Sequence, residues 1–123
     1  MCDVIQMSIG SRKINIAEIK KDYIANIIDA ARKCDLIDRV VLFGSSRESR
    51  CEKSSDIDLA VFGNKSSSRA LSSKQYERFA RQLYSFRDHE QAYDIIYFKT
   101  GSKSDSLIMN DISAGEVLYE RGE

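Results

Sequence analysis

Two short apolar segments separated by a polar stretch constrain the fold of this chain more than any other feature. Residues 40–43 are rich in β-branched side chains and end at Gly44, which is typical of a buried strand that leads into a turn. Residues 56–62 alternate polar and apolar side chains at their start and then become apolar, as a second strand would. The polar residues 45–55 between them predict a turn or short helix followed by a loop.

Two helices are predicted from capping signals and helical spacing. Asn15, with Glu18 three residues later, forms a capping-box pattern, and apolar side chains then recur at helical spacing to about Lys33. A second capping-box pattern, Ser72 with Gln75, begins an amphipathic segment. We expect this second helix to cover one face of a sheet.

The rest of the chain predicts further strands and one short helix. Residues 65–68 are expected to form a polar loop, and residues 93–98 a third strand, in which Asp94 is surrounded by apolar residues. Residues 106–112 have the pattern of a short helix, and residues 117–119 that of a last strand. This pattern of helices and strands permits an α/β fold.

Composition excludes several classes of protein. At 123 residues the chain has room for one domain. Lys plus Arg and Asp plus Glu each number 19, so no net charge attracts long nucleic acid or an anionic membrane. The apolar runs are too short to span a bilayer and the start lacks a signal-peptide pattern, so we expect a cytoplasmic protein. The cysteines are odd in number and widely spaced, which predicts reduced thiols at Cys2, Cys34 and Cys51.

Three aspartates in the predicted strands indicate a metal site. Side chains alternate along a strand, so Asp56 and Asp58 project from one face, about 6.5 Å apart. Like charges this close raise each other's pKa unless a cation lies between them, and hard oxygen ligands select Mg²⁺ or Mn²⁺. Asp94 would supply a third carboxylate from another strand. Taken alone, an Asp-x-Asp pair is more often a solvated strand edge, and Asp94 is alternatively an exposed edge-strand residue.

The turn after the first strand has the residues of a phosphate-binding site. Gly44 permits close approach of the backbone to a ligand and exposes amide N–H groups, and Ser45 adds a hydroxyl donor. Arg47, Arg50 and Lys53 follow on the same loop. They would neutralise a triphosphate, although such basic residues are more often simply solvated. Together with the aspartates, this turn predicts a site for a metal-bound nucleotide.

These residues resemble a known family. Leu42-Phe43-Gly44-Ser45, followed after ten residues by Asp56-Ile57-Asp58-Leu59 and later by Asp94, is similar to the nucleotidyltransferase superfamily that includes DNA polymerase beta and kanamycin nucleotidyltransferase. The similarity covers residues 40–98. It implies a polymerase-beta-like nucleotidyltransferase fold of the α/β (α+β) class, with a mixed, mostly antiparallel sheet of about four strands and helices packed on one face.

The resemblance also implies a role for each site residue. Asp56 and Asp58 would bridge two Mg²⁺ ions, with Mn²⁺ as an alternative, and Asp94 would complete the second metal site and help to take a proton. An acceptor hydroxyl would attack the α-phosphate of ATP and expel pyrophosphate. The implied nucleotide-binding residues are Gly44, Ser45, Arg47 and Ser55.

The length of the chain narrows the resemblance to the minimal nucleotidyltransferases, with residues 1–123 as a single domain of this kind. Members of this group are commonly encoded beside an all-helical HEPN protein, and the two form a toxin–antitoxin pair in which the small protein is the antitoxin. Some members transfer AMP from ATP onto a tyrosine of the partner. The implied partners are therefore a nucleoside triphosphate and a HEPN-type toxin.

One departure from the family pattern leaves other functions open. Members often carry an Arg-Gly pair after Gly-Ser, where this chain has Glu48 and Ser49. A non-catalytic antitoxin that acts by binding is therefore an alternative to the enzyme. A further alternative is a small-molecule (antibiotic) nucleotidyltransferase, for which the chain is short unless a homo-oligomer completes the acceptor pocket. His89, the single histidine, is interpreted as a surface residue past a helix end.

Overall fold

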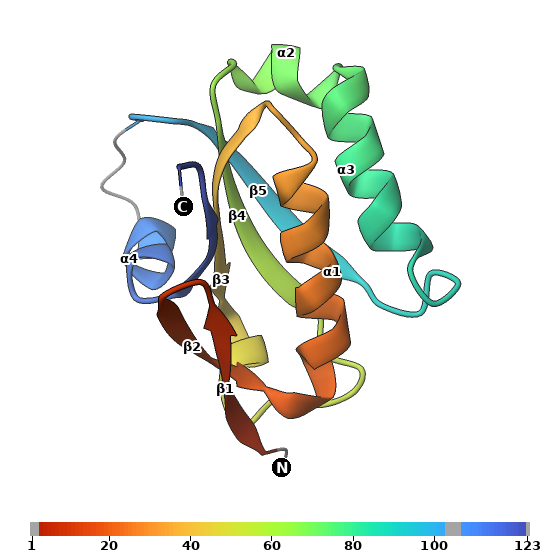
Figure 1. Cartoon of the computed structure of the whole chain (residues 1–123), viewed down its shortest axis with the longest axis vertical. Coiled ribbons are helices and arrows are strands. Elements are labelled where there is room, and N and C mark those ends of the chain that lie inside the picture. The colour runs from red at the N-terminus through yellow and green to blue at the C-terminus, as the bar shows by residue number, and fades with distance from the viewer. Residues whose placement is uncertain (1–2, 103–106, 123) are drawn as a thin grey trace.

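A four-stranded sheet in the order β5-β4-β3-β6 forms the centre of the computed structural model, which describes residues 3–102 and 107–122 (Figure 1). Its strands are β3 (Ile37–Phe43), β4 (Ile57–Gly63), β5 (Tyr93–Lys99) and β6 (Glu116–Glu120). β3 pairs antiparallel with both β4 and β6, whereas β5 joins β4 in parallel. The predicted mixed, mostly antiparallel sheet of four strands is thereby confirmed.

The central strands are apolar on both faces because both faces of the sheet are covered. Val40 and Leu42 of β3 belong to a core shared with two long helices, α1 (Lys21–Arg32) and α3 (Lys74–Ser85). Val41, next to them in sequence, belongs to a second, smaller core on the opposite face. Alternation along the strand thus sends successive side chains into two different cores.

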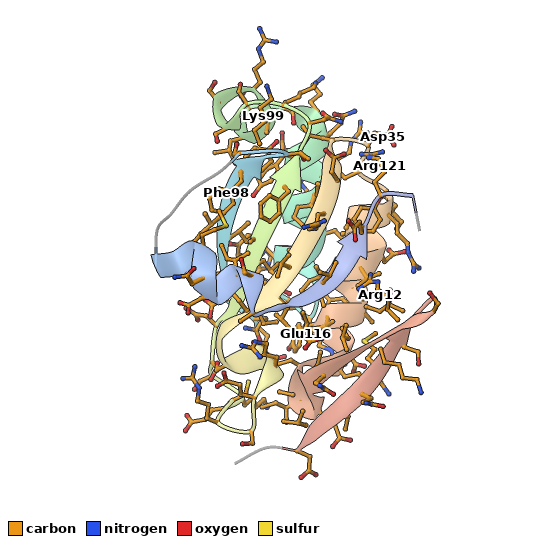
Figure 2. The ribbon with its side chains drawn as sticks, turned by 90° about the vertical axis from the view of Figure 1, so that its left-hand side faces the viewer. Arg12, Asp35, Phe98, Lys99, Glu116 and Arg121 are labelled. Atoms are coloured by element: carbon orange, nitrogen blue, oxygen red, sulfur yellow. The ribbon has the colours of Figure 1, made fainter. Side chains whose placement is uncertain are left out.

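The second face is covered by α4 (Leu107–Ser113), so the expectation that all helices pack on one face is wrong. Ile112 of α4 is buried against the sheet, in the core that contains Val41 and Ala60. Figure 2 shows α4 in front of the sheet on this face. Without α4, a continuous apolar surface of β3, β4 and β5 would face water, at a cost that scales with its area. The predicted helix over 106–112 is confirmed for the residues described; Ser106 lies outside them.

The predicted start of the first helix at Asn15 is wrong. Asn15 lies in β2 (Arg12–Ala17), which forms an antiparallel hairpin with β1 (Val4–Ile9). Ile14 and Ile16 alternate with exposed neighbours and are buried in the main core, so burial at a period of two overrides the local capping pattern. A short 3₁₀ turn, η1 (Glu18–Lys20), then leads into α1, which ends at Arg32 close to the predicted position.

The cap of the next long helix is displaced by one residue from the prediction. Ser73 is the N-cap of α3, and its Oγ accepts a hydrogen bond from the Tyr76 amide at 3.1 Å. Ser72 instead donates from its Oγ to the Ser68 carbonyl at 2.8 Å, because it completes the last turn of a short helix, α2 (Ser67–Leu71). The polar loop predicted at residues 65–68 is therefore partly helical.

The N-terminal hairpin is joined to the far edge of the sheet. Arg12 Nη1 donates to the Val117 carbonyl of β6 at 2.5 Å, and Figure 2 places Arg12 near Glu116 at the start of that strand. Within residues 3–102 and 107–122, no helix is both long and apolar enough to cross a bilayer. Cys34 and Cys51 are buried and form no disulfide among the described residues, and Cys2 lies outside them.

Candidate active site

The topology of the sheet brings three distant segments to one edge. β4 and β5 run parallel, and their starts lie side by side with Asp58 paired to Asp94. β3 runs antiparallel to β4, so its last residue, Phe43, is paired with the same Asp58. The turn that begins at Gly44 therefore follows directly beside Asp58, and Asp94 lies on the far side of β4.

The two paired aspartates project from the face that α4 covers. Ile57 and Leu59 of β4 are buried in the core on the α1 and α3 side, so Asp58 between them points to the opposite face. Asp94 shares that face with Ile96 of the smaller core, and it is exposed because β5 is an edge strand. Asp56 is also exposed and lies one residue before β4 rather than within it.

The electrostatics at Asp58 show that the three carboxylates share one region. Burial is the first cause of a raised pKa at Asp58, and the charges of Asp94 and then Asp56 raise that pKa further. The positive charge of Arg50 opposes these effects. The repulsion expected among the aspartates is thus present, and a bound cation would relieve it.

Gly44 makes room for the Asp58 carboxylate. Its φ is +76°, a left-handed conformation that other residues adopt only at a cost. A Cβ at this position would lie 3.1 Å from Asp58 Cγ and closer still to Oδ2, inside ordinary van der Waals contact. The glycine is therefore required both by the turn and by the carboxylate beside it, and the sequence suggested only the first of these reasons.

Ser46, which the sequence analysis did not single out, links this turn to the aspartates. It is fully buried in the 3₁₀ turn η2 (Gly44–Arg47), and its Oγ donates to the Asp56 carbonyl at 3.4 Å. Ser45 beside it is half-buried, and its carbonyl accepts a hydrogen bond from the Glu48 amide at 2.9 Å. Sequence alone offered no signal to separate these two adjacent serines, because only the fold decides which one faces inward.

The basic residues of the loop differ in their surroundings. Arg50 forms an exposed ion pair with Glu48, which raises the pKa of its guanidinium. Arg47 is half-buried, and among the described residues its Nε is buried with no hydrogen-bond partner. A buried donor without a partner is costly, so this nitrogen is suited to an added acceptor such as a phosphate oxygen.

The residues just before Asp56 are held by a buried lysine that the sequence analysis missed. Ser55 Oγ accepts from the Glu52 amide at 2.9 Å, and the Ser55 carbonyl accepts from Lys20 Nζ at 2.7 Å. Lys20 lies inside the helix that the sequence predicted from Asn15, and a lysine at such a position has no feature that marks it as buried. The proposed nucleotide contact of Ser55 stays a prediction.

The aspartate carboxylates at this edge of the sheet are chemically suited to bind a divalent cation. Carboxylate oxygens are the ligands that Mg²⁺ prefers, and the pKa of Asp58 is raised first by burial and then by the negative charges of Asp94 and Asp56. In the part of the chain that is described, however, no three His, Cys, Asp or Glu side chains are already gathered closely enough to hold an ion. The three-aspartate metal centre predicted from the sequence is therefore not preformed in this structure, and it stays a prediction.

Comparison with known protein families matches residues 25–123 to the family described as polymerase beta, nucleotidyltransferase. The match covers the central sheet, the turn at Gly44 and all three aspartates. A search of curated protein sequences finds no match to this chain.

Proposed function

Since this chain belongs to the polymerase beta nucleotidyltransferase family, its general activity is nucleotidyl transfer, and we propose that it moves AMP from ATP onto a hydroxyl of a partner protein. One observation carries the proposal: Gly44 leaves room for the Asp58 carboxylate at the sheet edge where Asp94 is paired beside it. A glycine turn next to paired carboxylates is an arrangement suited to a metal-bound triphosphate.

In this proposal some of the site residues bind the metal and the others bind the phosphates of the nucleotide. Asp56, Asp58 and Asp94 would hold two Mg²⁺ ions, with Mn²⁺ as an alternative. When bound, the metal would neutralise the triphosphate and lower the pKa of the acceptor hydroxyl. The nucleotide's phosphates would be held by Gly44, Ser45, Arg47 and Ser55.

The chemistry is an in-line displacement at the α-phosphorus of ATP. The acceptor oxygen forms the new bond, the bond to the β-phosphate oxygen breaks, and pyrophosphate leaves. A carboxylate oxygen of Asp94 accepts the hydroxyl proton. The exposure of Asp94 supports this role, because an acceptor on the surface of another protein can reach it.

The acceptor in this proposal is a HEPN-type helical toxin, and the chain is its antitoxin. Asp56 and Asp94 both face solvent at the sheet edge, which favours a macromolecular acceptor that docks there over a small molecule enclosed by the chain. The cytoplasmic location expected from the sequence, where ATP and Mg²⁺ are plentiful, belongs to the same proposal.

The test is transfer of label from ATP labelled at its α-phosphate to the protein encoded by the neighbouring gene. With Mg²⁺ present, the purified chain should label that protein, and Asp58→Asn should abolish the labelling. Asp29→Asn is the matched control, because Asp29 lies on α1 in an exposed ion pair with Lys33 and should not affect transfer. Labelling by the Asp58→Asn variant at the unchanged rate would refute the mechanism.

One observation favours a second candidate, a non-catalytic antitoxin that acts by binding. Glu48, which stands where relatives often have arginine, pairs with Arg50 and so takes up a positive charge otherwise facing the triphosphate. In this case Asp58→Asn should still neutralise the toxin in growing cells. Loss of neutralisation in parallel with loss of labelling would favour the enzyme instead.

A further inference from the structure

Lys20 is a charged side chain buried beneath the candidate site. It is only 1% exposed, although lysine is rarely buried unless its charge is partnered. Its Nζ donates to the carbonyls of Lys53 at 3.0 Å and Ser55 at 2.7 Å, and to Gln91 Oε1 at 2.6 Å. An ammonium has three N–H donors, so these three oxygens match its capacity.

Gln91 extends the hydrogen bonds of Lys20 into a buried network that reaches from the segment before β4 to the segment before β5. It is 6% exposed, and its Nε2 donates to the Ser55 carbonyl at 2.9 Å and to the Ala92 carbonyl at 2.7 Å. The Ala92 carbonyl also accepts from the Ile57 amide at 3.1 Å. Lys20 and Gln91 therefore tie together the two segments that immediately precede β4 and β5.

These two segments lead directly to the three aspartates, because Asp56 lies in the first of them and Asp58 and Asp94 are the second residues of β4 and β5. Ser55 directly precedes Asp56, and Ala92 is two residues before Asp94. Asp56 lies just outside β4, and the residue pairing with β5 begins only at Ile57. The buried network adds a constraint on its position, since both Lys20 and Gln91 bind the carbonyl of the residue adjacent to Asp56.

We propose that Lys20 and Gln91 are positioning residues, which hold the starts of β4 and β5 so that Asp56, Asp58 and Asp94 can bind divalent cations. This inference rests on the proposed function. Lys20 acts through its hydrogen bonds to the Ser55 carbonyl and to Gln91. Residues that orient metal ligands in this way typically change metal affinity about 10- to 100-fold when they are removed.

The experiment measures Mn²⁺ affinity by titration calorimetry and electron paramagnetic resonance, at a temperature where circular dichroism shows each variant folded. Lys20→Met should raise the Kd for Mn²⁺ about 10- to 100-fold. Lys33→Met is the matched control, because Lys33 is an exposed lysine at the end of α1 that pairs with Asp29. The Kd of this variant for Mn²⁺ should equal that of the wild type. Gln91→Ala retains the lysine but removes one of its three acceptors together with the donors to Ser55 and Ala92, so the Kd of this variant should also rise.

The possible outcomes distinguish failure of the positioning role from failure of the proposed nucleotidyl transfer. Wild type that binds no Mn²⁺ would refute the proposed function and the positioning role together. Mn²⁺ binding that is lost in Asp58→Asn but unchanged in folded Lys20→Met would overturn the positioning role and leave the function intact. If Lys20→Met does not fold, Gln91→Ala decides: wild-type affinity in that variant overturns the inference.

Discussion

Replacing Gly44 by alanine tests whether this glycine and Asp58 are physically coupled. At φ +76°, a left-handed conformation costs a residue with a Cβ about 1–2 kcal/mol. The new Cβ would also displace the Asp58 carboxylate, and forcing a side chain about 30° off its rotamer costs about 0.5–1.5 kcal/mol. Gly44→Ala should therefore lower the free energy of unfolding by about 1.5–3.5 kcal/mol.

Gly10→Ala is the matched control for the backbone part of this cost. Gly10 has φ +58° in the β1–β2 turn, and a Cβ there would meet no atom within 4 Å. It should cost only the backbone part, about 1–2 kcal/mol. Any gain from a stiffer unfolded chain is common to both substitutions and cancels in the comparison.

A double-mutant cycle in urea, followed by circular dichroism, isolates the contact. In an Asp58→Ala background no carboxylate is displaced, so the cost of Gly44→Ala should fall to that of Gly10→Ala. An equal cost of Gly44→Ala with and without the Asp58 carboxylate would refute the reasoning. The same cycle with Mn²⁺ should show that Gly44→Ala weakens metal binding whereas Gly10→Ala does not.

Three further predictions concern Asp58, the N-cap of α3 and Ile112. In the folded state the pKa of Asp58 is raised above its usual 3.8. Without metal, the free energy of unfolding of the wild type should therefore fall as the pH rises from 3.8 through the folded-state pKa. Urea titrations in EDTA should show that Asp58→Asn lacks this fall and is more stable than the wild type at neutral pH. Ser73→Ala should destabilise α3 by about 1 kcal/mol because it removes the N-cap, whereas Ser72→Ala should cost less, and equal effects in thermal melts would contradict the assignment of the cap. Ile112→Ala should cost about 2–5 kcal/mol through the cavity left under α4, and a cost below 1 kcal/mol would show that α4 does not close the second core.

The sequence by itself determined the three central-sheet strands β3, β4 and β5, the motif that they carry and the family. The strands at β3, β4 and β5 were predictable because alternation and β-branched content act within a few residues. The spacing from Gly44 to Asp58 was also informative, because the Gly-Ser turn and the Asp-x-Asp pair at that spacing carry the resemblance to the family. That local pattern was enough to indicate a nucleotidyltransferase, as the match over residues 25–123 confirms.

Tertiary structure decided the features that depend on residues far apart in the chain. Asn15 has a local capping pattern, yet burial of Ile14 and Ile16 places it in a strand. Lys20 is buried only because Gln91, 71 positions away, and the loop before Asp56 provide oxygen acceptors. No local pattern records such partners, because the free energy of burying a charge or an apolar side chain depends on what the rest of the fold packs around it.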